Sequence, residues 1–231
     1  NADVRLSYVV ASEPSPLYRN SIGDECVYLG SGSARLETTF GAMDIGPGDY
    51  AIIPRATTHR WVPTGEIPLE ALCIESSTHI GPPKRYLSKF GQLLEHSPYC
   101  ERDLRQPVGP LLAEDIGEDP DAETEVLIKH RGSGPGGVVG TVHTLPFHPL
   151  DVVGWAGCLY PYVFNTSDFE PITVRAPQPP PVHRPSEGCH LITCTSLPPT
   201  ARHHPLSRPR PPPPPHPPTP QTLSSTDPTT R

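Results

Sequence analysis

The chain has 231 residues, of which 35% are hydrophobic and 19% are charged, and its formal net charge is −7. This length suits one sizeable β domain or two small ones. The acidic balance argues against a nucleic-acid surface, and no apolar run approaches the roughly 20 residues that a membrane helix needs. We therefore expect no nucleic-acid partner and no membrane partner.

The cysteines predict a reducing compartment. The six of them are scattered, with no C-x-x-C pair and no dense framework, and no signal peptide is visible. This usage is typical of cytoplasmic proteins with free thiols. Cys100 stands next to Glu101 and Arg102, an arginine that would lower the pKa of a reactive thiol. No general base lies beside it in the sequence, so we interpret Cys100 as structural.

The first 80 residues have the pattern of a β barrel or sandwich. Residues 4–10 begin with the period-two alternation of a half-buried strand. Further short strands are predicted at 25–29, 34–40, 50–53 and 69–75, with turn sequences at 30–33 and 44–48. Strands at intervals of about ten residues, separated by turn chemistry, are typical of these two architectures.

The stretch from Gly48 to Trp61 is the most structured part of this region. A Gly-Asp turn leads into the strand, and Pro54 ends it because proline has no N–H to donate. His59 and Trp61 are two residues apart and share one face of the next strand. The order of glycine, proline, a small residue and histidine, at this spacing, resembles the second motif of cupin barrels. An ordinary strand–turn–strand with a core histidine is the alternative.

Glu25, followed seven residues later by Gly32, resembles the end of the first cupin motif. The metal-binding form of that motif has two histidines just upstream, where this chain has Tyr18, Arg19, Asn20 and Ser21. Imidazole and carboxylate ligands must converge from three or four positions to hold a metal, and only Glu25 and His59 remain. We therefore predict a barrel without metal ligands and a structural role for His59.

The residue pattern changes in the middle of the chain. Residues 82–110 are typical of an ordered loop that leaves the barrel and is anchored by aromatic side chains. Residues 125–131 predict another strand, and the glycine-rich 132–137 a turn; no helix follows it, which excludes a phosphate-binding loop. Residues 148–165 combine an acid with Trp, Tyr and Phe among turn residues. Such a stretch indicates an aromatic pocket or an interface, or equally a barrel rim packed on a neighbouring domain.

Several long motifs resemble homogentisate 1,2-dioxygenases of the bacterial type. They lie at 48–61, 91–103, 148–155, 160–162, 168–172 and 178–183, so the resemblance runs from about Asn1 to His183. It implies a bicupin enzyme that opens the ring of homogentisate with O2 at a non-haem Fe(II) and gives maleylacetoacetate. It also implies an iron-free N-terminal barrel, iron ligands from the C-terminal barrel, an acid/base histidine, and a homo-oligomer, trimeric or hexameric.

The chain departs from the family pattern where the iron site would begin. Pro177 stands where the family has a histidine, and Arg184-Pro185-Ser186 replaces Gln-Thr-Phe. His183 is the one residue that the resemblance carries over, as the candidate acid/base group. No paired glutamate follows His216, and Asp227 is the last carboxylate. We expect this chain to bind no Fe(II) of its own and to be inactive alone.

Four regions follow from these observations. They are a cupin-like β-barrel core at 1–80, loops and strands completing the N-terminal domain at 81–175, a degraded start of the second cupin region at 176–197, and a proline-rich, disordered tail at 198–231. The tail has little to bury and favours polyproline II structure. The missing initial methionine and this tail indicate a fragment, with a shifted reading frame past His183 as the simplest origin.

Two further functions remain open besides a dioxygenase fragment. The first is a metal-free cupin that acts as a small-molecule binding module. The second is an interaction protein that offers Arg210-Pro211-Pro212-Pro213 to an SH3-like groove.

Overall fold

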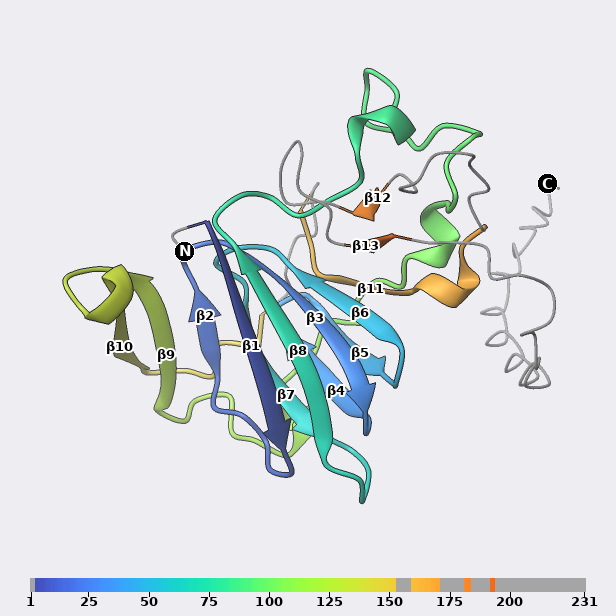
Figure 1. The fold of residues 1–231 in the computed structure, drawn as a ribbon. Coiled ribbons are helices and arrows are strands. Elements are labelled where there is room, and N and C mark those ends of the chain that lie inside the picture. The colour runs from blue at the N-terminus through green and yellow to red at the C-terminus, as the bar shows by residue number, and fades with distance from the viewer. Residues whose placement is uncertain (1–2, 153–158, 171–180, 184–191, 194–231) are drawn as a thin grey trace, which may run out of the picture. The chain divides into compact units, whose positions relative to one another are not determined.

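The computed structural model describes residues 3–152, 159–170, 181–183 and 192–193 (Figure 1). Its strands are β1 (Val4–Ala11), β2 (Tyr18–Asn20), β3 (Asp24–Ser31), β4 (Ala34–Thr38), β5 (Gly41–Ile45), β6 (Asp49–Ile53), β7 (Thr58–Pro63), β8 (Leu69–Ser76), β9 (Thr124–Arg131), β10 (Val138–Leu145), β11 (Tyr162–Asn165), β12 (Pro181–His183) and β13 (Ile192–Thr193). The helices are short 3₁₀ turns at Lys84–Tyr86, Glu101–Asp103, Glu114–Ile116, Pro135–Gly137 and Thr166–Asp168. None of the helices in the described ranges has the length or apolar character that crossing a bilayer would require.

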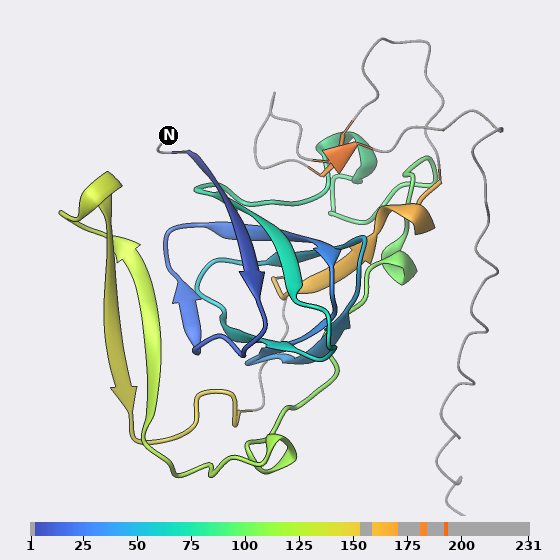
Figure 2. The ribbon, with the colours of Figure 1, turned by 60° about the horizontal axis from the view of Figure 1, so that its bottom comes forward.

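Two sheets face each other and form a jelly-roll barrel (Figure 2). One has the strand order β1-β8-β3-β6-β11 and the other β10-β9-β2-β7-β4-β5. From β3 to β8 the chain passes back and forth between the two sheets, as a double-sheet jelly roll requires. Neighbouring strands are antiparallel except for β2 and β9, which run parallel. The predicted mainly β fold of the cupin type is confirmed.

The inner faces of both sheets supply the main core. Side chains two residues apart on one strand point to the same face, so Val27 and Leu29 of β3 point inward together. They pack against Leu36 and Trp61 of the opposite sheet. Each such side chain contributes about 1.5–3 kcal/mol when it is fully buried. Trp61 and His59 lie on the same buried face, as their spacing predicts.

The outer face of the first sheet is covered by a second apolar layer. Cys26, Ile52 and Ile74 point outward from the sheet and pack against Ile80, Tyr99, Phe164 and Phe169. The Tyr99 and Phe169 rings stack with their centroids 4.5 Å apart. The prediction that aromatic side chains anchor the loop after β8 is confirmed for this part of it.

The β9–β10 hairpin extends the second sheet and projects from the barrel in both views (Figures 1 and 2). Its turn contains the glycine-rich segment 132–137, where Gly136 and Gly137 have φ values of 69° and 73°. Glycine adopts such angles without strain. The predicted strand at 125–131 and the turn after it are therefore confirmed, and the partner strand β10 is an addition.

Three other strands differ from the sequence-based expectation. β5 lies where part of a turn was predicted at 44–48, and the turn occupies only the residues after Ile45. β2 is only three residues long, too short for a periodic signal. β11 lies inside the aromatic stretch 148–165 and pairs with β6, so Val163 and Phe164 are fully buried. The aromatic residues of that strand therefore serve the barrel and its outer layer.

Two of the predicted regions lie mostly or wholly outside what the structure describes. Within 176–197 it describes only β12 and β13, which pair antiparallel as a separate two-stranded sheet. The tail at 198–231 lies outside the described residues, so its predicted disorder stays a prediction.

Candidate functional site

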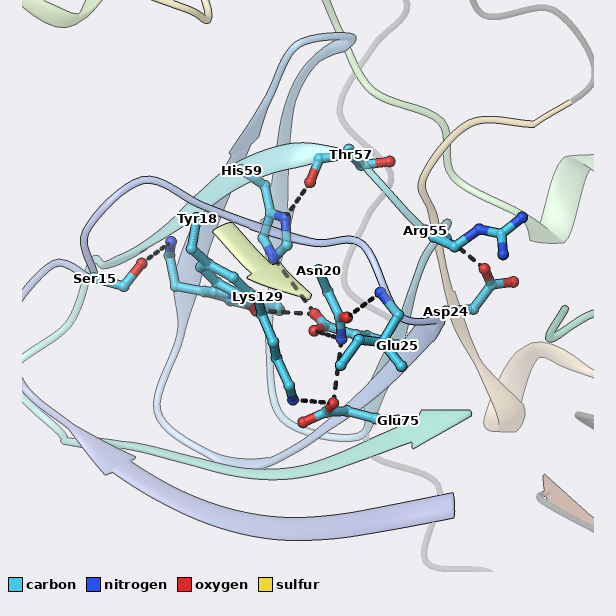
Figure 3. A network of polar contacts seen from close by, with 12 residues as sticks. Ser15, Tyr18, Asn20, Asp24, Glu25, Arg55, Thr57, His59, Glu75 and Lys129 are labelled. Carbon is cyan, nitrogen blue, oxygen red and sulfur yellow. Dashed lines mark hydrogen bonds and ion pairs between the residues drawn. The ribbon is translucent and has the colours of Figure 1, made fainter. Parts of the chain in front are cut away.

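A cluster of polar side chains occupies the barrel interior at one end, where β3 and β7 begin and β8 ends (Figure 3). Glu25 continues the inward face that Val27 and Leu29 occupy further along β3. Tyr18 lies directly opposite His59 in the β2–β7 pairing. Because the other inward positions are apolar, this end is where charged groups lie within the barrel core.

The carboxylate of Glu25 is 6% exposed, and its hydrogen bonds come from β2. The Tyr18 hydroxyl donates to Oε2 at 2.9 Å, and the Asn20 side-chain amide donates to Oε1 at 2.7 Å. The same amide reaches Glu75 Oε2 at 3.2 Å, and Lys129 forms an ion pair with that oxygen. A buried carboxylate needs such donors, since an unpaired charge in the interior is costly.

Asn20 is the link between the two carboxylates. It is 3% exposed, and its carbonyl oxygen accepts the Ile22 N–H at 3.0 Å while its amide nitrogen donates to Glu25 and Glu75. This arrangement fixes the orientation of the amide, because both partners of the nitrogen are acceptors. Figure 3 shows Asn20 between Glu25 and Glu75, with the Lys129 side chain reaching in from β9.

His59 is fully buried, and only one of its two ring nitrogens has a hydrogen-bond partner. Its Nδ1 lies 3.0 Å from the carbonyl oxygen of Thr57, which only accepts, so Nδ1 carries a proton. Its Nε2 makes no hydrogen bond and lies 3.6 Å from Glu25 Oε2. The Tyr18 ring covers the imidazole at a centroid distance of 4.1 Å.

Burial dominates the electrostatics of this cluster. Desolvation lowers the pKa of His59, although Glu25 and the Thr57 carbonyl both act to raise it. We therefore assign the neutral imidazole, with Nε2 unprotonated. Burial, followed by the charge of Glu25, raises the pKa of Tyr18 well above its ordinary value. The same two causes raise the pKa of the neighbouring Cys73 thiol to about 11.

The donor set does not fit an Fe(II) site. Glu25 and His59 come together, but within the described residues no group of three or more His, Cys, Asp and Glu side chains is arranged to hold a metal ion. The Tyr18 hydroxyl also lies beside Glu25, but it is neutral and donates its O–H to that carboxylate. A facial Fe(II) site takes two histidines and a carboxylate. The chemistry that this cluster supports is hydrogen bonding and ion pairing.

A cleft of about 800 Å³ opens beside the cluster. Glu75 and Lys129 belong to both the cluster and the cleft wall, and Arg5 and Arg131 add further positive charge. The segment Pro135–Gly137 closes one side. This cleft is large enough for a small molecule.

The remaining predicted site residues are distributed as follows. His183 is the last residue of β12, and its side chain lies outside the described part of the chain. His203, His204 and His216 fall in the tail, which the structure does not describe. Cys100 is partly buried, and its backbone N–H donates to Asp103 at 2.8 Å. Its structural role and the role of His183 stay predictions.

The sequence reasoning missed the partners that hold Glu25. Tyr18 and Asn20 were read only as the absence of histidines, although their spacing of two residues places both on one face of a strand. Glu75 follows Ala71 and Cys73 on the inward face of β8, so the alternation of that strand would have pointed to it. Lys129 could not be found this way, because it depends on the parallel pairing of β2 with β9.

The chain is similar in sequence to proteins that are named dioxygenases. No family model matches. A protein of Saccharolobus solfataricus that bears the name of a dioxygenase is 33% identical over 209 residues, which are 90% of this chain and 50% of that protein. The homogentisate 1,2-dioxygenase of Rhodopseudomonas palustris strain BisA53 is 31% identical over 71% of this chain and 33% of its own length. The enzyme of the same name from Bradyrhizobium diazoefficiens is 32% identical over 67% and 31%.

Solved structures with a similar fold are more distant. A cupin-2 domain protein of Shewanella frigidimarina has a TM-score of 0.30 at 15% identity, covering 32% of this chain and 71% of that one. An oxalate decarboxylase of Bacillus subtilis has a TM-score of 0.29 at 20% identity, covering 32% and 21%.

The chain therefore spans between a third and a half of the length of the curated relatives it matches. By sequence, it is a relative of the homogentisate 1,2-dioxygenases.

Proposed function

We propose that this chain is part of a homogentisate 1,2-dioxygenase, which opens the aromatic ring of homogentisate with O2 and gives maleylacetoacetate. The observation that carries the proposal is the sequence similarity of about 30% to enzymes of that name over 67–71% of the chain. The jelly-roll barrel is consistent with it, as a scaffold for the parent enzyme. A cytoplasmic location and a homo-oligomeric parent belong to the same proposal.

We further propose that the chain as given does not catalyse this reaction alone. Ring opening by O2 in this family requires Fe(II), and no group of three or more His, Cys, Asp and Glu side chains that could hold a metal ion occurs among the described residues; His59 and the Tyr18 hydroxyl lie beside Glu25. His183 stays the proposed acid/base residue of the parent. The barrel cluster then has a structural role, which is to hold β2, β3, β7 and β8 together at one end.

The test is iron loading and oxygen uptake. The 231-residue chain is incubated anaerobically with Fe(II), desalted, analysed for metal and then assayed with homogentisate on an oxygen electrode. The Rhodopseudomonas palustris enzyme is the positive control. We expect far less than one iron per chain and no oxygen consumption. A chain that retains one iron and opens the ring would overturn this, and His183, His203, His204 and His216 would then be the ligands to substitute first.

A separate experiment tests whether the chain is part of a homogentisate dioxygenase. The genomic DNA past the codon for His183 is sequenced and translated in all frames. We expect a shifted frame that encodes a barrel with a His…Glu…His pattern, and the repaired product is expected to open homogentisate. A repaired product that binds iron and leaves homogentisate unchanged would contradict the proposed substrate.

A metal-free small-molecule binding module is the second candidate, and the 800 Å³ cleft favours it. Positive side chains from β1 and β9, Arg5, Lys129 and Arg131, line that cleft. Equilibrium dialysis of the metal-free chain with homogentisate distinguishes the two functions. Binding that is lost in Arg131→Gln would support the module, whereas no binding would argue against a module that takes homogentisate in this cleft.

A further inference from the structure

A second polar site lies at the same end of the barrel, on the side opposite to the Glu25 cluster. Asp24 precedes Glu25 on β3, and successive side chains of a strand point to opposite faces. Asp24 is 5% exposed and accepts three hydrogen bonds. Its Oδ1 accepts the Arg55 N–H at 2.9 Å, and its Oδ2 accepts the Ile80 N–H at 2.9 Å and His79 Nδ1 at 2.8 Å.

This carboxylate therefore joins three separate segments of the chain. Arg55 belongs to the turn after β6, and His79 and Ile80 belong to the loop after β8. Burial opposes the charge of Asp24, but the donors from His79, Ile80 and Arg55 more than offset it and lower the pKa of the carboxyl. Both oxygens are engaged, so Asp24 holds its neighbours in place rather than facing a ligand.

His79 is the group that Asp24 presents to solvent. The hydrogen bond to the carboxylate orients the imidazole and leaves Nε2 as its free edge. That bond, together with the negative charge, raises the pKa of His79 against the effect of partial burial. The side chain is 58% exposed, and within the described part of the chain no hydrogen bond reaches its Nε2. A protonated His79 therefore has one N–H available to an acceptor.

His79 is one of the residues that line a cavity of about 390 Å³. The side chains that line it combine two cations with several hydroxyls: Arg55, His79, Thr39, Thr57, Ser77 and Thr78. Asp24 is the only carboxylate among the lining residues, and its oxygens are already occupied. The remaining lining residues, Gly23, Phe40, Pro54, Ala56 and Leu159, are uncharged, so the side chains around the cavity carry more positive than free negative charge in a chain whose net charge is −7.

We propose that this cavity binds a small oxyanion, a carboxylate or phosphate group, between the His79 imidazolium and the Arg55 guanidinium. Charge-assisted hydrogen bonds from two cations are the strong form of anion recognition, and the hydroxyls supply further donors. The site is separate from the Glu25–His59 cluster, and it does not depend on the dioxygenase function or on a metal.

In the test, the full chain is titrated with anions at constant ionic strength, and the histidine Cε1–H signals are observed by NMR. The probes are sodium acetate, sodium phenylacetate and sodium phosphate, with sodium chloride as the reference anion. We expect a saturable shift of the His79 signal with at least one of the first three. Tighter binding of the two carboxylates would identify a carboxylate site, and tighter binding of phosphate a phosphate site.

Two variants and a control make the result specific. Arg55→Gln removes an exposed cation, and His79→Gln keeps an N–H donor for Asp24 while removing the imidazole. Each is expected to weaken binding at least tenfold, and the affinities of the variants are measured by equilibrium dialysis because His79→Gln removes the NMR reporter. The control is His143→Gln, an exposed histidine on β10 that does not line the cavity, and its affinity is expected to be unchanged. Non-saturable shifts, an equal response to chloride, or full binding by Arg55→Gln would overturn the proposal.

Discussion

His59 and His79 lie at the same end of the barrel in opposite electrostatic environments. His59 is fully buried, and desolvation lowers its pKa. His79 is largely exposed, and its contact with Asp24 raises its pKa. The two shifts have opposite consequences for stability, because a folded state is favoured at pH values where its groups hold the protonation they prefer.

We expect His59 to destabilise the folded chain at acidic pH. An unfolded histidine takes up a proton near pH 6.5, whereas the buried one does so only at lower pH. The contribution of the neutral His59 to the free energy of unfolding is thus fully present above about pH 6.5, and it is lost as the pH falls through the folded-state pKa. His59→Phe, which keeps an aromatic ring against Tyr18, should therefore lose less stability than the wild type between neutral and acidic pH.

Urea unfolding at a series of pH values measures this difference. His79→Asn is the matched comparison with the opposite sign, since the contribution of a raised pKa is fully present below about pH 6.5 and is lost as the pH rises through the folded value. Parallel pH profiles of the wild type and His59→Phe would show that burial does not shift the pKa of His59, and a wild type that gains stability relative to His59→Phe at acidic pH would show a charged His59 paired with Glu25.

Among the secondary-structure elements, the turn between β6 and β7 explains the motif that the sequence displays. Ala56 has a φ of 68°, and among the described residues it is the one non-glycine with a positive φ. Only a small residue is tolerated there, and glycine suits it best because it has no Cβ to clash. The small residue in the Gly48–Trp61 motif is therefore required by backbone conformation, while the proline before it ends β6.

Ala56→Gly should stabilise the chain. A left-handed conformation costs an L-residue roughly 1–2 kcal/mol, and the larger entropy of glycine in the unfolded chain offsets about 0.4–1 kcal/mol of that gain. We expect a net increase of up to about 1 kcal/mol in the free energy of unfolding, measured by urea denaturation. The control is Ala122→Gly, at a turn position without a positive φ, which should lose stability. A loss in both variants would contradict the strain argument.

The pairing of β3 with β8 depends on Gly23, which precedes β3 and lies against Ser76 at the end of β8. A Cβ at this position would lie 1.8 Å from the backbone oxygen of Ser76, a contact that no side-chain rotation relieves. Gly23→Ala should therefore separate the strands beside Asp24 and Glu25, at a cost of about 3 kcal/mol, the upper end of the range for overpacking. Gly46→Ala is the control, because nothing lies within 4 Å of its added Cβ. Thermal unfolding of both variants measures the difference, and equal midpoints would show that the strands adjust.

The strands with clear period-two alternation or strong turn signals were predictable, and those that depend on distant partners were not. Leu69–Ser76 is an example of the first kind, and its pattern survives because one face lies on the core. Val4–Ala11 is a strand as its alternation predicts, but none of its residues is buried, so the expected half-buried face is wrong. Tyr162–Asn165 belongs to the second kind: it reads as turn-rich aromatic sequence and becomes a strand only by pairing with β6. The Glu25–His59 pair was predictable for the same local reason, whereas Lys129 needed the tertiary fold.

At the scale of the whole molecule, β11 is one of several strands that contribute to both apolar layers. Val163 of β11 packs in the inner core, and the next residue, Phe164, packs in the outer layer around Tyr99 and Phe169. Because the two side chains belong to one strand of one sheet, neither layer can open widely without displacing the other. We therefore expect the barrel and the segments that cover it to unfold together.

Two cysteines report on the two layers separately. Cys26 points into the outer layer, and Cys73 of the neighbouring strand β8 packs against the inner core. Burial raises the pKa of Cys26 to about 12 and that of Cys73 to about 11, so neither forms the reactive thiolate in the folded chain near neutral pH.

Alkylation by iodoacetamide at increasing urea concentrations, quantified by mass spectrometry of the cysteine peptides, should give both thiols the same midpoint. Cys100, which is only partly buried in the loop, is the internal reference and should react at lower urea. A midpoint for Cys26 clearly below that for Cys73 would show that the outer layer opens independently, and the link through β11 would then not couple the layers.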